Sequence, residues 1–281
     1  MSLGEQLAER LGRPRDSRFF IINCDDLGSS HAANVASLKA MELGTATSAT
    51  LMVPCPWARD AARLFQGRDV GVHLTLTAEY PGYRWRSLTG AKSLHDDDGF
   101  FPATMDAAVA KAKADDVRAE CHAQIRQALD WGVDVTHLDA HMGTMNVHRP
   151  FFEIFVDLAV EYRLPLRLLG EWEGKVLGFD STTYARERGV LFPDLFIFNW
   201  APRETRRELE RARTQVKPGV SEICTHPVLE GEELRGYDPD HPDHRANDAA
   251  CLMDSGTKRM LDESGLELIS FRPLRDLQRS R

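Results

Sequence analysis

The stretch FFIINCDDLG (residues 19–28) begins as an apolar β-strand and ends in two adjacent carboxylates and a glycine. The carboxylates of Asp25 and Asp26 repel each other, and a buried strand offers them no spare partners. An aspartate at this place can also cap a following helix, because its side chain accepts hydrogen bonds from free amides at the helix start. The pair therefore needs either a helix N-terminus or a positively charged partner.

Outward from this stretch, short apolar runs alternate with segments of helical period. The apolar runs predict strands at 19–25, 47–53, 69–76, 135–140, 165–169, 195–199, 220–225 and 267–271. The helical periods predict helices at 31–43, 115–131, 149–164 and 245–264. Because strands separated by helices need crossover connections, we expect a parallel sheet in a (β/α) barrel or a doubly wound fold. No G-x-G-x-x-G follows the first strand, which argues against the dinucleotide-binding version.

Two of the predicted helices have a defined apolar stripe. The stripe in 149–164 contains Phe151, Ile154, Phe155, Leu158, Ala159 and Tyr162. In 31–43 the predicted buried face contains Val35, Leu38 and Met41, and Gly44 is a C-terminal stop signal. Between the regular segments lie two long irregular stretches, 78–102 and 227–244, which we interpret as functional rims or lids.

Composition narrows the class of protein. The 281 residues fit a single (β/α) barrel domain of roughly 250 residues, with 1–17 as a short N-terminal helix or tail. A net charge of −8 argues against a nucleic-acid partner, and no apolar run is long enough to span a membrane. The five scattered cysteines and the lack of an apolar signal segment favour a reducing, cytoplasmic location. We take a homodimer as the default oligomeric state.

Ionisable residues cluster where the predicted strands end. They are Asp25, Asp26, His73, Asp139, His141, Arg167 and His226. Ligands of parallel α/β folds bind beyond the carboxyl ends of the strands, so these side chains should meet at one rim. Each histidine alone could be a core residue, but their coincidence predicts a shared metal or catalytic site.

Two imidazoles and one carboxylate can hold a divalent metal ion and leave open positions for water and substrate. With such an ion present, one aspartate can coordinate it and the other can stay ionised as a general base. We expect a single divalent ion, with Mg²⁺ and Zn²⁺ as the leading candidates.

Four motifs in order, IINCDDLG, VGVHLTLT, THLDAH and EICTHP, together with ISFRPLRDL at the end, resemble the YdjC-like (ChbG/HpnK) carbohydrate deacetylase family. The resemblance spans about residues 18–277. It implies a distorted (β/α) barrel of the polysaccharide-deacetylase (NodB-like) type with about seven parallel strands.

The resemblance also implies a reaction, the removal of an N-acetyl group from an amino sugar or an N-acetylglucosamine-containing saccharide by a metal-bound water. The carboxylate ligand would be Asp26, with His73 and His141 as imidazole ligands. Asp25 would be the general base, and His226 the acid that protonates the leaving amine. Apart from the resemblance, we weigh two roles for Arg167, orienting Asp25 or His226 and forming a structural ion pair elsewhere in the barrel, and Asp139 is a further supporting or substrate-binding candidate.

The sequence departs from the family pattern after His141. Met142 and Gly143 replace histidines that the family commonly has there. Since neighbours of His141 are candidates to line the sugar pocket, this change leaves the identity of the substrate open. The tract EYPGYRWRSL (79–88) predicts either a sugar-contacting loop, with Tyr83 and Trp85 in supporting or substrate-binding roles, or a packed surface loop. No role is assigned to 170–195.

Two other functions fit the same residues. One is a metal-dependent hydrolase of a different amide or of a phosphoester. The other is a barrel that binds a saccharide or a metal without catalysis, although a binder has no use for an acid and a base.

Overall fold

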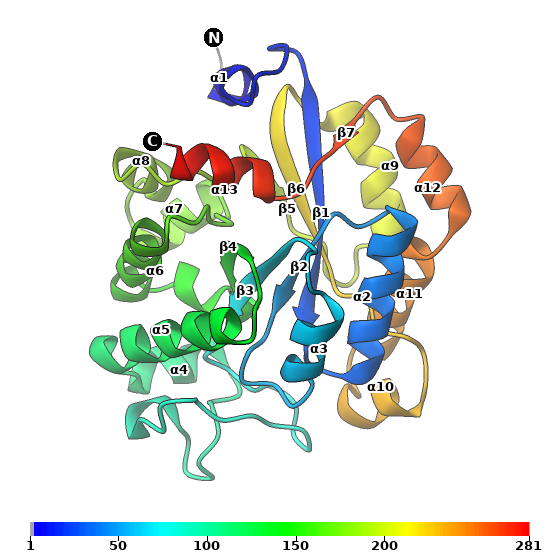
Figure 1. Ribbon diagram of the computed structural model, residues 1–281. Helices are drawn as coiled ribbons and strands as arrows, with labels where there is room; N and C mark the ends of the chain where they lie inside the picture. Colours follow the sequence, from blue (N-terminus) through cyan, green and yellow to red (C-terminus); the bar gives the residue numbers. More distant parts are fainter. Residues whose placement is uncertain (1–2, 281) are drawn as a thin grey trace.

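The computed structural model describes residues 3–280, and its strands form one parallel sheet around β1 (Figure 1). The strands are β1 (Arg18–Leu27), β2 (Ser48–Leu51), β3 (Val70–Leu74), β4 (Val135–Ala140), β5 (Leu195–Ile197), β6 (Gly219–Thr225) and β7 (Glu267–Leu268). Their order is β4-β3-β2-β1-β6-β5, and β7 pairs with the first residues of β1. Every pairing is parallel, so the carboxyl ends of the strands share one rim.

The sheet has the expected architecture of a distorted (β/α) barrel. In the described residues, β4 and β5 stand at the two ends of the strand order and do not pair with each other, so the sheet forms an open half-barrel. Seven of the eight predicted strands are present, within a few residues of the expected bounds. The α/β class and the parallel half-barrel predicted from the sequence are confirmed.

Helices surround the half-barrel, with α5 and α6 on one side and α2, α9, α11 and α12 on the other (Figure 1). The helices are α1 (Leu3–Arg10), α2 (His31–Leu43), α3 (Ala58–Leu64), α4 (Met105–Lys111), α5 (Ala114–Asp130), α6 (Arg149–Tyr162), α7 (Glu171–Leu177), α8 (Ser181–Glu187), α9 (Thr205–Gln215), α10 (Glu232–Tyr237), α11 (Pro242–Leu252), α12 (Ser255–Asp262) and α13 (Arg272–Arg279), with short 3₁₀ turns η1 (Lys92–Leu94) and η2 (His141–Asn146). No helix in the described residues is long and apolar enough to cross a membrane.

The two chain ends lie together at the end of the half-barrel where the strands begin (Figure 1). Leu7 of α1 and Leu274 of α13 belong to one small apolar cluster with Phe19 and Val220, which lie near the starts of β1 and β6. The terminal helices therefore cover this end, and the opposite rim remains for the polar residues.

The predicted strand at 165–169 is wrong. Only an isolated bridge between Leu138 and Leu166 joins this segment to β4. Pro165 has no backbone N–H to donate, so the segment begins with a residue that cannot extend a ladder. The segment nevertheless passes beside the end of β4 and delivers Arg167 to the rim.

The single helix predicted at 245–264 is also wrong, because the chain breaks between α11 and α12. Asp254 caps α12 by accepting a hydrogen bond from the Thr257 amide (2.9 Å). Since an N-cap residue has non-helical backbone angles, one continuous helix cannot pass through it. The irregular stretch predicted at 227–244 contains all of α10 and the first residues of α11, whereas 78–102 is irregular as expected apart from η1.

The bounds of α2 and its Gly44 stop are confirmed, with Gly44 in the left-handed region at φ 78°. Its predicted buried face is wrong. Val35, Leu38 and Met41 are only partly buried, and the small residues Ala33, Ala36, Ser37 and Ala40 face the core. Small side chains let α2 pack closely against β1. In α6, by contrast, the predicted stripe is buried except for the half-buried Tyr162.

Candidate active site

The backbone at the end of β1 separates the two neighbouring carboxylates. The register between β1 and β2 shifts between Cys24 and Leu27, and Asp26 has a left-handed backbone with φ 61°. A non-glycine residue in this region is strained, typically by about 1–3 kcal/mol. The kink directs Asp25 and Asp26 toward different partners, which relieves the repulsion expected of adjacent carboxylates.

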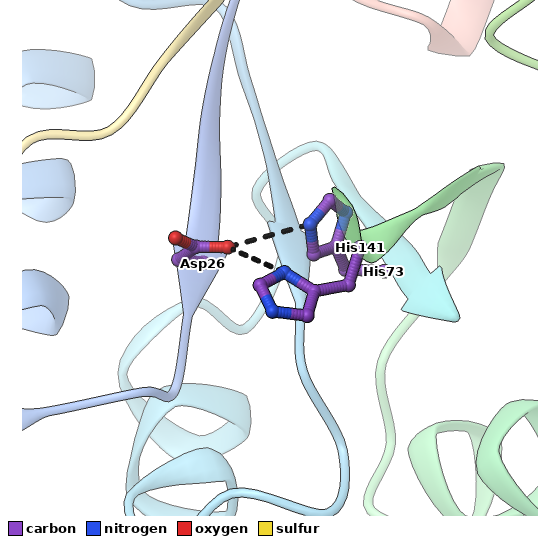
Figure 2. Close-up of side chains that lie close together, drawn as sticks. All are labelled: Asp26, His73 and His141. Carbon is purple, nitrogen blue, oxygen red and sulfur yellow. Dashed lines mark ion pairs between the residues drawn. The ribbon is translucent and has the colours of Figure 1, made fainter. Parts of the chain in front are cut away.

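Asp26 meets two histidines from other strand ends (Figure 2). Its Oδ1 lies 3.4 Å from Nε2 of His73, which is in β3, and 3.2 Å from Nδ1 of His141, which follows β4. All three residues are buried. Two histidines and one aspartate from three strands therefore present one donor atom each to a common point.

These donors fit a divalent metal ion. Oδ1 of Asp26 is buried without a hydrogen-bond partner among the described residues, although it faces two ring nitrogens. Metal–ligand bonds of about 2.1 Å at tetrahedral or octahedral angles place neighbouring donors about 3.0–3.4 Å apart, which matches these distances. The expected ligand set of Asp26, His73 and His141 is thus brought together in a geometry that can hold an ion.

Each of the two imidazoles has a carboxylate on its other ring nitrogen. Nδ1 of His73 lies 2.6 Å from Oδ1 of Asp139, and Nε2 of His141 lies 2.9 Å from Oε2 of Glu79. Such contacts fix ring orientation in metal sites and direct a lone pair toward the ion. Burial opposes protonation of His73, but Asp139 outweighs it and raises the His73 pKa to about 10. Metal binding must therefore displace a proton from this ring.

The second oxygen of Asp26 is occupied by Arg245 from α11. Nη1 of Arg245 donates to Oδ2 of Asp26 at 2.7 Å, while its Nε and Nη2 donate to Asp238 (2.8 Å) and Tyr80 (2.6 Å). Burial favours the neutral acid, but Arg245 and the two histidines hold the pKa of Asp26 well below its usual range. Arg245 thus leaves only Oδ1 of Asp26 free for an ion.

Asp25 points to Arg167 instead. Nη1 and Nη2 of Arg167 donate to its two oxygens at 2.6 and 2.8 Å, and Asn23 adds a third bond at 2.8 Å. Burial raises the pKa of Asp25, but the Arg167 guanidinium outweighs this and holds the pKa at about 2. Arg167 also contacts Asp139 and Glu222, so one cation serves three buried carboxylates.

His226 follows β6 and faces Asp25. Its Nε2 lies 3.8 Å from Oδ2 of Asp25, and its backbone N–H donates to Asp248 at 2.7 Å. Burial lowers the pKa of the His226 ring to about 3, so the ring is neutral at pH 7. The Trp200 ring packs against it with centroids 4.6 Å apart.

The two aromatic residues expected in the 79–88 loop have packing contacts. Trp85 is buried, donates from its indole nitrogen to the Thr77 carbonyl (2.7 Å), and lies beside the His141 ring with centroids 6.2 Å apart. Tyr83 is half-buried and donates to the Ser29 carbonyl at 2.6 Å. Trp85 therefore packs beside the site, and Tyr83 packs in turn against Trp85 with centroids 6.1 Å apart.

Four charged residues of the site were not identified from the sequence: Glu79, Glu222, Arg245 and Asp248. Glu79 lies in an irregular loop, and Arg245 and Asp248 lie within the predicted helix 245–264, where charged residues are common and indicate no site. Glu222 lies within a predicted strand, where a charge in an apolar run was a usable signal.

The chain is similar to known proteins over most of its length. The profile described as YdjC-like protein matches residues 19–263. The chain belongs to the YdjC-like family. A carbohydrate deacetylase of Thermus thermophilus is 36% identical over 264 residues, covering 92% of this chain and 94% of that protein. A carbohydrate deacetylase of Geobacillus stearothermophilus is 29% identical over 259 residues, covering 91% and 97%.

The fold of this YdjC-like chain also has a solved counterpart. A crystal structure from Enterococcus faecalis V583, described provisionally as a cellobiose-phosphate cleavage protein, superimposes with a TM-score of 0.79. It is 23% identical in sequence and covers 92% of this chain and 99% of its own. The similarity establishes a shared fold over almost the whole length of both proteins.

Proposed function

We propose that this protein is a metal-dependent carbohydrate N-deacetylase that hydrolyses the acetamide of an amino sugar or of an N-acetylglucosamine-containing saccharide. The observation that supports it most is the convergence of Asp26, His73 and His141 on one point directly beside Asp25. The two relatives above, both named carbohydrate deacetylase, support the reaction class.

The ion would be held by Oδ1 of Asp26, Nε2 of His73 and Nδ1 of His141. A divalent ion bound there polarises an amide carbonyl and makes a nearby water more acidic. Two imidazole donors favour Zn²⁺ or another transition ion over Mg²⁺, which prefers oxygen ligands.

Asp25 and His226 would handle the proton. At rest Asp25 is ionised and His226 is neutral, so the pair can accept one proton from water as its oxygen adds to the acetamide carbon. Oδ2 of Asp25 and Nε2 of His226 are 3.8 Å apart, which is too long for a direct hydrogen bond, so the proton would pass to the ring through one bridging water. His226 then gives it to the sugar nitrogen as the C–N bond breaks, because an unprotonated amine anion is too poor a leaving group. Acetate and a free amine result.

The supporting residues would act through these groups. Arg167 fixes both oxygens of Asp25, and Asp139 fixes the ring of His73. Trp85 packs against His141, and Tyr83 holds the loop in place over Ser29. Met142, 41% exposed beside the ligand His141, stands where a sugar would approach.

The proposal includes a cytoplasmic location. All five cysteines are buried as free thiols, which suits a reducing compartment.

The test is acetate release from N-acetylglucosamine, chitooligosaccharides and other N-acetylated sugars. The assay is run on untreated protein, on protein treated with a chelator, and after Zn²⁺ is restored. We expect acetate that disappears with the chelator and returns with the metal. Activity confined to non-sugar amides or phosphoesters would identify a different metal hydrolase. Saccharide binding without any product would identify a non-catalytic barrel.

A further inference from the structure

A second group of metal-ligating side chains lies on the far side of His226 from the first site. It consists of His226 after β6 and of His244 and Asp248, which are one turn apart on α11. One nitrogen or oxygen of each residue lies within 4.8 Å of the other two, and Nε2 of His244 is 3.7 Å from Oδ2 of Asp248. None of the three belongs to the Asp26, His73 and His141 set.

Two ring nitrogens of this group lack partners. Nδ1 of His226 and Nε2 of His244 are buried and have no hydrogen-bond partner in the part of the chain that the structure describes. The His244 side chain is only 8% exposed. Burying a polar nitrogen without a partner is unfavourable, so two of them facing one carboxylate indicate a missing ligand.

The donors are also held in position. The Trp200 ring packs against both His226 and His244, with centroid distances of 4.6 and 4.8 Å. Asp248 accepts hydrogen bonds from the His226 amide and from the Thr205 hydroxyl. Arg245, next to His244 in the chain, is paired with Asp26 and Asp238.

We propose that His226 Nδ1, His244 Nε2 and Asp248 Oδ2 form a second site for a divalent transition-metal ion such as Zn²⁺. Two imidazoles and one carboxylate are ligands that such ions prefer. Each ring has one buried nitrogen without a hydrogen-bond partner among the described residues, so each offers a donor to an ion. The donors stand wider apart than those of the first site and must close on the ion, so the second site is the weaker one.

Occupation of this site would inhibit the enzyme, a consequence that rests on the proposed function. For Nε2 of His226 to accept a proton from the Asp25 side, the ring's own proton must sit on Nδ1. A metal ion on Nδ1 takes that position, so the ring proton moves to Nε2 and no lone pair remains there. Zn²⁺ in excess of the first site is therefore expected to lower the rate of acetate release.

The test counts bound Zn²⁺ per chain. Metal-stripped wild type, His244→Phe and His241→Phe are dialysed against buffered Zn²⁺, and their metal content is measured. His241 is the matched control, because its ring also packs against Trp200 (5.4 Å) but lies outside the donor group. We expect two ions in the wild type and in His241→Phe. In His244→Phe we expect one ion, because the weaker site loses one of its three donors.

A single ion in the wild type, or two ions in His244→Phe, would overturn the proposal. If His244→Phe does not fold, His244→Gln replaces it in the same comparison. Excess Zn²⁺ should slow acetate release by the wild type and by His241→Phe, relative to each protein's own rate, but not by His244→Phe. Because the ion count needs no substrate, two ions in a protein that releases no acetate would leave the second site standing and refute the deacetylase.

Discussion

Replacing Glu222 by glutamine should make the metal-free protein more stable above pH 7 and leave its stability at about pH 4 unchanged. Glu222 is fully buried in β6. Its Oε1 contacts Nε and Nη2 of Arg167 at 2.8 and 2.7 Å, and its Oε2 has no hydrogen-bond partner among the described residues. Burial raises its pKa from the ordinary 4.5 to about 7, although Arg167 acts in the opposite direction.

The sign of the effect follows from proton binding. Between pH 4.5 and about 7 the folded protein keeps a proton on Glu222 that the unfolded chain has lost, so stability falls as the pH rises through this window. At about 1.4 kcal/mol per pH unit, the penalty is about 3 kcal/mol once the pH exceeds 7. Glutamine resembles the neutral acid and is not subject to this penalty.

The assay is urea unfolding of wild type and Glu222→Gln at pH values from about 4 to about 8, with metal removed. The free energies of unfolding should coincide at the acid end and separate by about 3 kcal/mol at the alkaline end. Glu171→Gln, at the exposed start of α7, is the control and should show no such separation. Curves for Glu222→Gln and wild type that stay parallel across the range would refute the reasoning.

Two further predictions concern the backbone and the metal. Arg245→Met should weaken metal binding about 10–100-fold, because Oδ2 of Asp26 loses the donor that fixes the carboxylate. Competition with a chromophoric chelator measures this, and an unchanged affinity would show that Arg245 has no part in orienting Asp26. Gly28→Ala should cost about 1–3 kcal/mol in urea unfolding, because φ is +91° and the new Cβ would lie 2.9 Å from Ala58 Cα. Gly67→Ala is the control, because Gly67 also has a positive φ (+77°) but has open space around it, so this variant suffers backbone strain without a clash. If both variants lose the same stability, the contact with Ala58 does not contribute to the cost of Gly28→Ala.

The sequence predicted the site best where an ionisable residue lies at or near the end of an apolar run. Asp26, His73 and His141 each follow or end an apolar run that forms a strand, and parallel strands must bring their carboxyl ends together. The parallel sheet and a shared site at its rim could therefore be predicted from the pattern, whereas the barrel form and the choice of Asp26, His73 and His141 as ligands came from the resemblance to the YdjC-like family.

The residues that orient the site could not be found in this way. Arg245 contacts Asp26 across 219 positions of sequence, from a helix whose start lies in a stretch predicted to be irregular. Glu79 sits in a loop without period, so nothing local connects it to His141. Long-range packing decides these contacts, whereas periodicity reports only which face of an element is buried.

Some local errors were avoidable. Asp254 three residues before Thr257 is an N-cap signal that splits 245–264 into two helices. The buried face of α2 was misjudged for a different reason, because close packing on β1 selects small side chains over the larger apolar ones that define a stripe.

The central claim is that Asp26, His73 and His141 hold the ion while Asp25 acts as the base. The most direct test measures bound metal and acetate release on the same preparation of Asp25→Asn. Both oxygens of Asp25 are bonded to Arg167, and Asp25 is not one of the three donors that face the ion, so this variant should bind the ion at the first site with wild-type affinity. Its turnover should fall about 10²–10⁴-fold, which is the usual effect of removing a positioned acid–base group. Wild-type turnover in Asp25→Asn, or loss of the ion together with the activity, would contradict the account.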